Sequence, residues 1–539
     1  MKSVLRALMC SAAVLVASAA QAGNPAVTIA IDAGKNKHAI NPMIYGVAFA
    51  TPAQLTALNA PLNRMGGNAT STYNWAQNAT NLGQDWYFES YPQDGGATKG
   101  GSADNFISDT KSANAQPMIT VPLVGWVAKL GSGRSILPSF SVAKYGAQCD
   151  VDPYDNDAGD GLLTDCSTPI TGNNPHDSYV RDSVDLEQGW VQHLVNKWGL
   201  SSVGGVPYYL MDNEASIWFS THRDAHPKGP HADEYRDKVI AESASIKSLD
   251  PGALVVAPEE WGWEAYFYSG YDQQYAAAHG YSKWPDHHKE QHGMDYVPWL
   301  LSEWKAAGHP VDVVSVHYYP QSGEDSNNTT TQMQLLRNQS TRELWDKNYV
   351  SKSWINAPVY LIPRMLSWIK KQYYAGTPIA ITEYNWGAEN HINGATTQAD
   401  IYGIFGREGL GMGTRWTTPD ASTPTFKAMQ MYRNYDGGNG AFGDTSISTA
   451  PSSNADDLSA FGALRTSDGA MTVMVINKDL SGSTPVSLQM VHAKQSGTAK
   501  VYQLTSANTI QHLADKSWSG GTLADTVPAQ SITLYVLPQ

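Results

Sequence analysis

Two glutamates, each at the end of a short apolar run, are the residues of this sequence best placed to do chemistry. Glu214 lies in PYYLMDNEASIW and Glu383 lies in PIAITEYNWGAENHINGA, both among Asn, Trp, Tyr or Gly. A carboxylate pair delivered by two strands can act as nucleophile and general acid/base, the chemistry that cleaves a glycosidic bond. Either glutamate alone could equally be a hydrogen-bonded cap. The pair, with no nucleotide or phosphate motif nearby, favours the catalytic interpretation.

The runs that carry these glutamates belong to a series of strand-like segments that alternate with helical patterns. This alternation predicts an α/β fold, a (β/α)8 TIM-like barrel with long inserts after the second and third strands. In such barrels the active-site residues gather at the carboxyl ends of the strands, where Glu214 and Glu383 fall. The expected barrel strands are 43–50, 62–67, 116–123, 206–214, 253–260, 311–319, 378–386 and 410–416.

The pattern changes after residue 436, where short alternating strands are separated by Gly, Ser and Asp turns. It predicts an additional antiparallel β-sandwich over 437–539, following a catalytic barrel over 43–436. Residues 23–42 contain the strand-like AVTIAIDAGKNKHAI, which we expect to join that sandwich. No Pro/Ser-rich linker and no internal repeat is visible, which argues against a detachable binding module.

Residues 1–22 have the pattern of a cleaved secretory signal, with Lys2 and Arg6 before an apolar run and a small-residue site at its end. We therefore expect a secreted protein, extracellular or periplasmic. No later segment approaches the ~18 apolar residues of a membrane span, so no membrane association is expected. The formal charge of −14 gives no electrostatic reason to bind nucleic acid. We expect a monomer.

Two cysteines remain after the expected signal, and acidic residues are concentrated between them. Export to an oxidising compartment favours a disulfide between Cys149 and Cys166 over two unpaired buried thiols. The intervening Asp152, Asp155 and Asp157 offer the oxygen ligands of a structural Ca²⁺. The spacing departs from that of an EF-hand, and a solvated acidic turn is the alternative.

Several polar and aromatic residues at expected strand ends are candidates for the surroundings of the glutamates. Arg64 could keep Glu383 ionised, or form a purely structural ion pair. Asn213 could donate to a sugar 2-hydroxyl, and Tyr318 could orient the nucleophile. Flat sugar faces stack on indole rings, although core packing is the alternative for each Trp. The remaining substrate-binding candidates are Asn68, Trp75, Trp126, Trp261, Trp263, Trp386 and Trp416.

Histidine pairs leave a different enzyme class open. His222 and His226, and likewise His288 and His292, are four residues apart and could present two imidazoles on one helix face to zinc. Neither pair contains the HExxH glutamate that would serve as a metalloprotease base. A zinc-dependent hydrolase is therefore the weaker hypothesis, and polar or surface histidines are the simpler interpretation.

Long segments of the chain resemble glycoside hydrolase family 44, the retaining endo-β-1,4-glucanases and xyloglucanases. The resemblance runs in order from about residue 26 to the end, and the family's fold, a barrel joined to a β-sandwich, agrees with the expectation above. The segments that carry it include NRMGGNATSTYNWAQNATNLGQDWYFES, DNEASIWFSTHRDAHP, PEEWGWEAYFYS, VHYYPQ, LIPRMLSWI and ITEYNWGAENHINGATTQADIYGIFGREGL.

The resemblance implies a role for each glutamate. Glu214 matches the general acid/base and Glu383 the nucleophile, while Ala215 stands where such motifs usually have Pro. The rival carboxylates Glu259 and Glu260 match no chemical step. The implied activity is hydrolysis of internal β-1,4 bonds in cellulose-like glucans and xyloglucan, with no cofactor required. The alternatives are a β-mannanase or xylanase of similar architecture and a non-catalytic glycan-binding protein.

Overall fold

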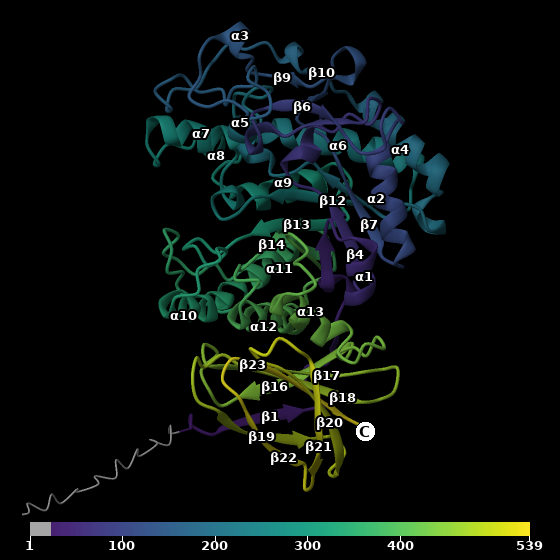
Figure 1. Cartoon of the computed structure of the whole chain (residues 1–539), viewed down its shortest axis with the longest axis vertical. Coiled ribbons are helices and arrows are strands. Elements are labelled where there is room, and N and C mark those ends of the chain that lie inside the picture. Colours follow the sequence, from purple (N-terminus) through teal and green to yellow (C-terminus); the bar gives the residue numbers. More distant parts are fainter. Residues whose placement is uncertain (1–22) are drawn as a thin grey trace, which may run out of the picture.

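Eight parallel strands close into a barrel at the centre of the molecule (Figure 1). The structure is a computed structural model that describes residues 23–539, so the expected signal at 1–22 lies outside the described residues. Each barrel strand falls within one of the eight expected segments, and the predicted α/β barrel is confirmed. The strands are β3 (Gly46–Ala48), β4 (Leu62–Met65), β7 (Gln116–Val121), β11 (Tyr208–Met211), β12 (Leu254–Glu260), β13 (Val313–Tyr318), β14 (Ile379–Tyr384) and β15 (Met412–Arg415).

The barrel interior is filled with apolar side chains. Alternate residues of successive strands, among them Leu62, Met118, Leu210 and Val256, form one buried cluster. Because a strand turns successive side chains to opposite faces, the residues between them pack against the surrounding helices instead. The filled interior leaves the carboxyl ends of the strands as the place where polar side chains can meet.

Helices surround the barrel, and one of them, α12, packs against the strands of the C-terminal sandwich. Nearly every residue of α12 is buried, and at Gly403 an added Cβ would lie 2.1 Å from the Phe461 ring, so only glycine allows this approach. None of the helices in residues 23–539 has the length and apolar character to span a membrane. The principal helices are α1 (Pro52–Leu58), α2 (Gly101–Ser112), α4 (Val184–Trp198), α6 (Ala232–Leu249), α7 (Gly270–His279), α9 (Tyr296–Ala306), α10 (Thr331–Ser340), α11 (Leu361–Gln372), α12 (Ile392–Glu408) and α13 (Pro424–Arg433).

A ten-stranded sheet lies below the barrel in Figure 1. Strands from both ends of the sheet share one apolar core, so the sheet folds over itself as a sandwich. One pairing departs from the expected antiparallel pattern, because β1 runs parallel to β19 while pairing antiparallel with β16. The strands are β1 (Val27–Asp32), β2 (His38–Ala39), β16 (Thr445–Pro451), β17 (Leu458–Leu464), β18 (Met471–Asn477), β19 (Thr484–Val491), β20 (Gly497–Leu504), β21 (Gln511–Trp518), β22 (Thr522–Val527) and β23 (Ser531–Leu537).

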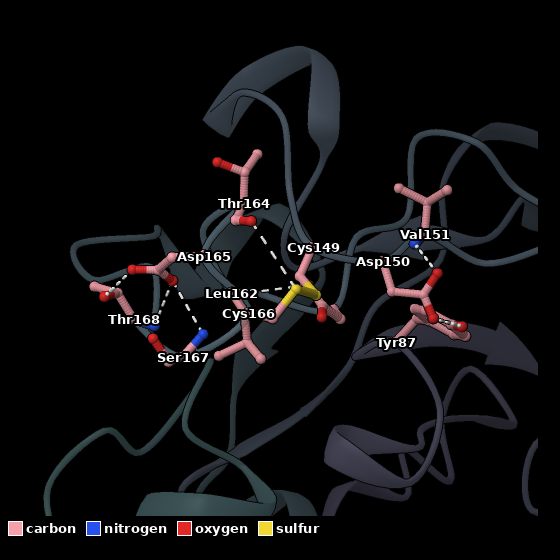
Figure 2. The surroundings of a disulfide bond; sticks show 11 residues. Tyr87, Cys149, Asp150, Val151, Leu162, Thr164, Asp165, Cys166, Ser167 and Thr168 are labelled. Atoms are coloured by element: carbon pink, nitrogen blue, oxygen red, sulfur yellow. Dashed lines mark hydrogen bonds between the residues drawn. A yellow bond between two sulfur atoms is a disulfide. The ribbon is translucent and has the colours of Figure 1, made fainter.

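The inserts after β4 and β7 form a cap above the barrel in Figure 1. Cys149 and Cys166 are joined by a disulfide within this cap, as the sequence predicts (Figure 2). Around the bridge, Asp165 accepts hydrogen bonds from Ser167 and Thr168, which closes a tight polar turn. The short elements of the cap are β5 (Ala79–Asn81), β6 (Glu89–Pro92), β8 (Trp126–Ala128), β9 (Leu137–Pro138), α3 (Val142–Tyr145) and β10 (Tyr179–Arg181).

Candidate active site

The two glutamates singled out in the sequence face each other at the carboxyl end of the barrel. Glu383 lies on β14, and Glu214 follows β11. One carboxylate oxygen of each, together with a ring nitrogen of His317, lie within 4.8 Å of one another. Both side chains are largely buried, with exposed fractions of 7% for Glu383 and 15% for Glu214. The pair therefore brings two carboxyl groups close together at the end of the barrel.

The backbone at the end of β11 aims Glu214 into this space. Asp212 and Glu214 both have positive φ, which turns the chain sharply after the strand. The carboxylate of Asp212 holds the turn by accepting hydrogen bonds from Ser71 and from the backbone of Asn213. The Glu214 amide donates to the carbonyl of Glu259 on β12. These contacts fix the carboxylate of Glu214 relative to the barrel.

Arg64 connects the carboxylates at the base of the site. Its Nη1 lies 2.7 Å from Glu383 Oε1, and its Nη2 lies 3.0 Å from Glu259 Oε2. The guanidinium is fully buried. Burial alone would lower the pKa of Arg64, but Glu383 and Glu259 raise it overall, so the positive charge is retained. The Arg64–Glu383 ion pair anticipated from the sequence is present.

His317 is a buried link that the sequence reasoning did not identify. Its Nδ1 lies 2.8 Å from Glu214 Oε1 and its Nε2 lies 3.2 Å from Glu259 Oε2. Although burial lowers the pKa of His317, the neighbouring carboxylates, Glu383 first among them, raise it to about 10. The ring is then an imidazolium that donates from both nitrogens. The pKa of Glu214 is raised by burial, against the opposing effect of His317.

Tyr319, rather than Tyr318, contacts the candidate nucleophile. The Tyr319 hydroxyl donates to Glu383 Oε2 at 2.9 Å. The Tyr318 hydroxyl instead donates to Glu343 at 2.6 Å, on the outer side of β13, so the expectation for Tyr318 is wrong. The reason is strand alternation: His317 and Tyr319 share the face toward the site, and Tyr318 points away. This alternation in HYY was the signal available in the sequence.

Asn213 and Asn68 form an amide pair beside Glu214. Asn213 Oδ1 accepts from Arg64 Nη2 at 3.0 Å and from the Gly67 amide, while its Nδ2 donates to Asn68 Oδ1 at 3.2 Å. Asn68 in turn donates to both carboxylate oxygens of Asp85. The oxygen of Asn213 is therefore committed to the protein, and its amino group has one hydrogen left for a ligand.

The Trp candidates divide between the site and the core. Trp416 lies over Arg64, with the guanidinium carbon 5.8 Å from the ring centroid, and contacts Gly67, whose φ of +84° and lack of Cβ leave room for the ring. Phe49, 45% exposed, packs edge-on against Trp416 and was missed in the sequence. Trp261 is half-buried, with its indole nitrogen bonded to Gln273 on α7.

The other indoles are engaged in hydrogen bonds or in packing against neighbouring side chains. Trp386 is buried and bonded to Ser340, and Trp126 is buried against Arg181. Trp75 bonds to the Leu186 carbonyl on α4, and Trp263 packs between Phe267 and Arg364. The structure therefore favours core packing for the buried Trp386 and Trp126, whereas Trp75 and Trp263 are partly exposed and their substrate contacts stay predictions.

The carboxylates of the acidic loop make local hydrogen bonds, and they do not bring three ligand oxygens within 4.8 Å of one another in residues 23–539. Asp157 accepts from Ser141 and from the Ala143 amide at the start of α3, so it caps this short helix. Glu89 lies beside Asp152, and its buried Oε1 has no partner among the described residues. Burial first, then Asp152 and Asp155, raise the pKa of Glu89 to about 8.

The histidine pairs do not form two-ligand faces. His222 is fully buried, and burial lowers its pKa to about 4, whereas His226 bonds to Glu234 and to the Lys228 carbonyl. Two groups of three ligand atoms within 4.8 Å occur in residues 23–539, Glu214–His317–Glu383 and a surface group of His231, Asp286 and Glu290. Neither contains a histidine from the expected pairs.

Comparisons with known proteins agree with the site. The family model of glycoside hydrolase family 44 matches residues 79–322. A solved structure of CelM2, a bifunctional glucanase-xylanase protein from a metagenome library, is 56% identical, covers 96% of this chain and 99% of its own, and superimposes with a TM-score of 0.94. A Paenibacillus polymyxa family 44 xyloglucanase solved with xyloglucan is 26% identical over 96% of this chain and 100% of its own, with a TM-score of 0.78.

A curated relative is much longer than this chain. The β-mannanase/endoglucanase A of Caldicellulosiruptor saccharolyticus is 25% identical over 88% of this chain, which spans only 36% of that protein's length. The family match, the high identity over the whole of CelM2 and the shared barrel and sandwich lead to one assignment. The chain belongs to glycoside hydrolase family 44.

Proposed function

We propose that this glycoside hydrolase is a retaining endo-β-1,4-glucanase that acts on cellulose-like glucans and xyloglucan. The observation that carries the proposal is the closeness of the two carboxylates, one oxygen of each lying within 4.8 Å of the other across the end of the barrel. Retaining enzymes hold their carboxyl groups about 5 to 5.5 Å apart, whereas inverting enzymes leave room for a water between them.

Glu383 is the proposed nucleophile. Arg64 donates to its Oε1 and Tyr319 donates to its Oε2, which orients the carboxylate. Its attack on the anomeric carbon forms a glycosyl-enzyme while Glu214 protonates the departing oxygen. In the second step Glu214 removes a proton from water, and the water oxygen displaces Glu383 with net retention of configuration.

The charge balance of the site favours one proton on a carboxyl group. With Glu214, Glu259 and Glu383 ionised, and with Arg64 and His317 positive, the cluster carries one net negative charge. Burial penalises that charge, and it raises the pKa of Glu214. Glu214 is therefore the group that holds the catalytic proton in the resting enzyme. Nothing in these steps requires a cofactor.

The substrate class follows from the relatives and from the shape of the aromatic surface. CelM2 is described as acting on glucan and xylan, and the polymyxa enzyme was solved with xyloglucan. Trp416 and the exposed Phe49 lie together beside Arg64, where a β-linked sugar ring can stack. A xylanase or a β-mannanase remains the alternative, favoured by the activities for which CelM2 and the Caldicellulosiruptor protein are named.

The decisive test measures both specificity and stereochemistry. Purified protein is incubated with β-glucan, xyloglucan, xylan and mannan, and the size of the products is followed together with the anomeric ratio by proton NMR. We expect rapid loss of chain length on glucan and xyloglucan with β-anomers formed first. Initial α-anomers would refute retention, and hydrolysis confined to mannan or xylan would refute the substrate assignment. No hydrolysis of any polymer would favour a glycan-binding protein.

We also propose two features outside the catalytic step. A structural Ca²⁺ in the cap, with oxygen ligands from Asp152, Asp155 and Asp157, is part of the proposal because this acidic segment between the cysteines offers the hard donors that Ca²⁺ prefers. Residues 1–22 are proposed to direct export, which the Cys149–Cys166 disulfide supports, since disulfides persist in oxidising compartments. The exported protein is proposed to act as a monomer.

A further inference from the structure

A second polar cavity lies at the junction of the barrel and the sandwich. Its volume is about 330 Å³, within the range of small-molecule sites. It is lined by α12, by the segment after α10 and by the loop between β16 and β17, and it contains none of the residues of the catalytic cluster. We call it the junction cavity and define it by Thr341, Trp345, Asp400, Arg407, Asn454 and Ala455.

Two buried polar atoms at this cavity have no partner among residues 23–539. Asp400 is 1% exposed; its Oδ2 accepts from Lys478 at 2.8 Å and from Thr341 at 2.7 Å, but its Oδ1 is unpaired. Arg407 donates from Nε to Glu408, but its buried Nη2 is unpaired. A buried donor or acceptor without a partner is destabilising, so both atoms favour a ligand that pairs them.

The charges and rings around the cavity indicate a neutral ligand with an apolar face. Lys478 balances Asp400, Glu408 balances Arg407, and Arg342 is paired with Asp346 and Asp456. These groups carry three positive and four negative charges, so an anionic ligand is disfavoured. The indole of Trp345 also lines the cavity, with the guanidinium carbon of Arg407 4.3 Å from its ring centroid. An aromatic ring beside one hydrogen-bond donor and one hydrogen-bond acceptor is typical of sugar recognition.

The positions of the two side chains bear on the size of the ligand. Asp400 and Arg407 are seven residues apart on α12, so their Cα atoms are roughly 10 Å apart along the axis. A ligand with two separated polar groups can meet both side chains. A hydroxyl can donate to the carboxylate, and another hydroxyl oxygen can accept from the guanidinium. A phosphate would suit Arg407 alone and would be repelled by Asp400.

We propose that the junction cavity is a second carbohydrate site, which binds one or two β-linked glucose rings of a glycan away from the catalytic cleft. The choice of glucose rests on the proposed function, whereas the neutral, hydroxyl-rich character of the ligand rests on the cavity itself. Such a site holds a polysaccharide on the enzyme between cleavage events. By raising the local substrate concentration, it strengthens binding to long chains and leaves the cleavage of short substrates unchanged.

The test uses the full chain in an inactive Glu383→Gln background, labelled with 5-fluorotryptophan. The fluorine resonance of Trp345 is assigned with Trp345→Phe, and that of the cleft residue Trp416 with Trp416→Phe. Cellotetraose is titrated into the labelled protein, with inorganic phosphate as a separate probe. Ala455→Trp fills the junction cavity from its partly exposed loop, and Ala507→Trp places the same ring on an exposed turn outside the cavity as the matched control.

We expect the Trp345 resonance to shift and saturate with cellotetraose, and the shift to vanish in Ala455→Trp but not in Ala507→Trp. A Trp345 resonance that does not move, or that moves only with phosphate, overturns the proposal. The Trp416 resonance reports on the cleft separately, so the junction site and the proposed function can fail independently. In the active enzyme, Ala455→Trp should weaken apparent affinity for xyloglucan polymer while kcat/KM on an aryl cellobioside stays unchanged.

Discussion

The Nδ1 atom of His317 lies 2.8 Å from Oε1 of Glu214, and this contact links the proposed acid/base to a buried positive charge. The same ring reaches Glu259 through Nε2, so both nitrogens of the imidazolium are used. One oxygen of Glu214 is therefore fixed by His317, and the other is left for the proton that goes to the leaving group. The proton affinity of Glu214 reflects a balance between burial and this imidazolium.

Replacing His317 by Gln should move the alkaline limb of the pH profile. Because the imidazolium lowers the pKa of Glu214, its removal lets that pKa rise, and the protonated acid persists to higher pH. The alkaline limb of the kcat/KM profile should shift to higher pH. At the same time kcat should fall by roughly 10²-fold, because the carboxyl group of Glu214 loses its orientation. The measurement is kcat/KM against pH on an aryl cellobioside. An unshifted limb would contradict the link, and His309→Gln, an exposed histidine, is the control.

Replacing each of the two glutamates should impair catalysis in a different way. Glu383→Gly removes the nucleophile and should abolish turnover on every substrate. Glu214→Ala should lose about 10²- to 10⁴-fold on polymers yet keep activity on aryl glycosides whose leaving groups need no proton. Azide should rescue this second variant and give a β-glycosyl azide, identified by NMR. An α-glycosyl azide from Glu214→Ala would show that the roles or the stereochemistry are misassigned.

The strand pattern allowed the barrel and the two glutamates to be predicted because fully buried strands are short apolar runs that end where polar residues begin. β13 and β14, VVSVHY and IAITEY, are buried along their whole length, and their positions could be read directly. Arg64 could be paired with Glu383 for the same reason, since both lie at or near strand ends on the same edge of the barrel.

Other features depend on geometry that spacing does not reveal. Assigning the Glu383 contact to Tyr318 instead of Tyr319 is an error of one residue, and one residue in a strand changes the face. Trp386 follows Glu383 closely, but its ring turns back into the core to bond Ser340. The exposed Phe49 becomes a site residue only because β15 and β3 are neighbours in the closed barrel. The parallel pairing of β1 with β19 joins segments more than 450 residues apart.

The two adjacent tyrosines provide a matched pair of variants. Tyr319→Phe removes a hydrogen bond to the Glu383 carboxylate, and bonds to charged groups contribute about 1.5 to 3 kcal/mol, so kcat should fall roughly 10- to 100-fold. Tyr318→Phe leaves the site intact and removes only the bond to Glu343. It should lower the free energy of unfolding by about 1 to 2 kcal/mol without changing kcat. Steady-state kinetics and urea unfolding distinguish the two variants. A loss of kcat in Tyr318→Phe with kcat unchanged in Tyr319→Phe would restore Tyr318 as the site residue.

The disulfide should stabilise the cap more than it affects catalysis. Cys149 and Cys166 are 17 residues apart, and a loop of that length contributes roughly 3 kcal/mol in the chain-entropy model. The Cys149→Ser/Cys166→Ser variant should lose thermal stability but keep its kcat at moderate temperature. Intact-mass analysis without reductant should show no free thiols in the parent protein. Two free thiols would contradict the bridge.

Removing metal ions by chelation distinguishes a structural role of a bound ion from a catalytic one. The glutamate pair supplies every proton transfer and bond-forming step of the proposed mechanism, so a Lewis acid has no task in it. If Ca²⁺ binds Asp152, Asp155 and Asp157, its removal should lower Tm, because a ligand that binds only the folded state stabilises it. Asp152→Asn should weaken the Tm response to added Ca²⁺, whereas Asp109→Asn, at an exposed position of α2 outside the cap, should retain it. Initial rates are measured before and after exhaustive EDTA dialysis, with folding followed by circular dichroism. We expect unchanged rates; a large loss in folded protein that zinc restores would make the Glu214–His317–Glu383 group a metal site and overturn the mechanism proposed for it.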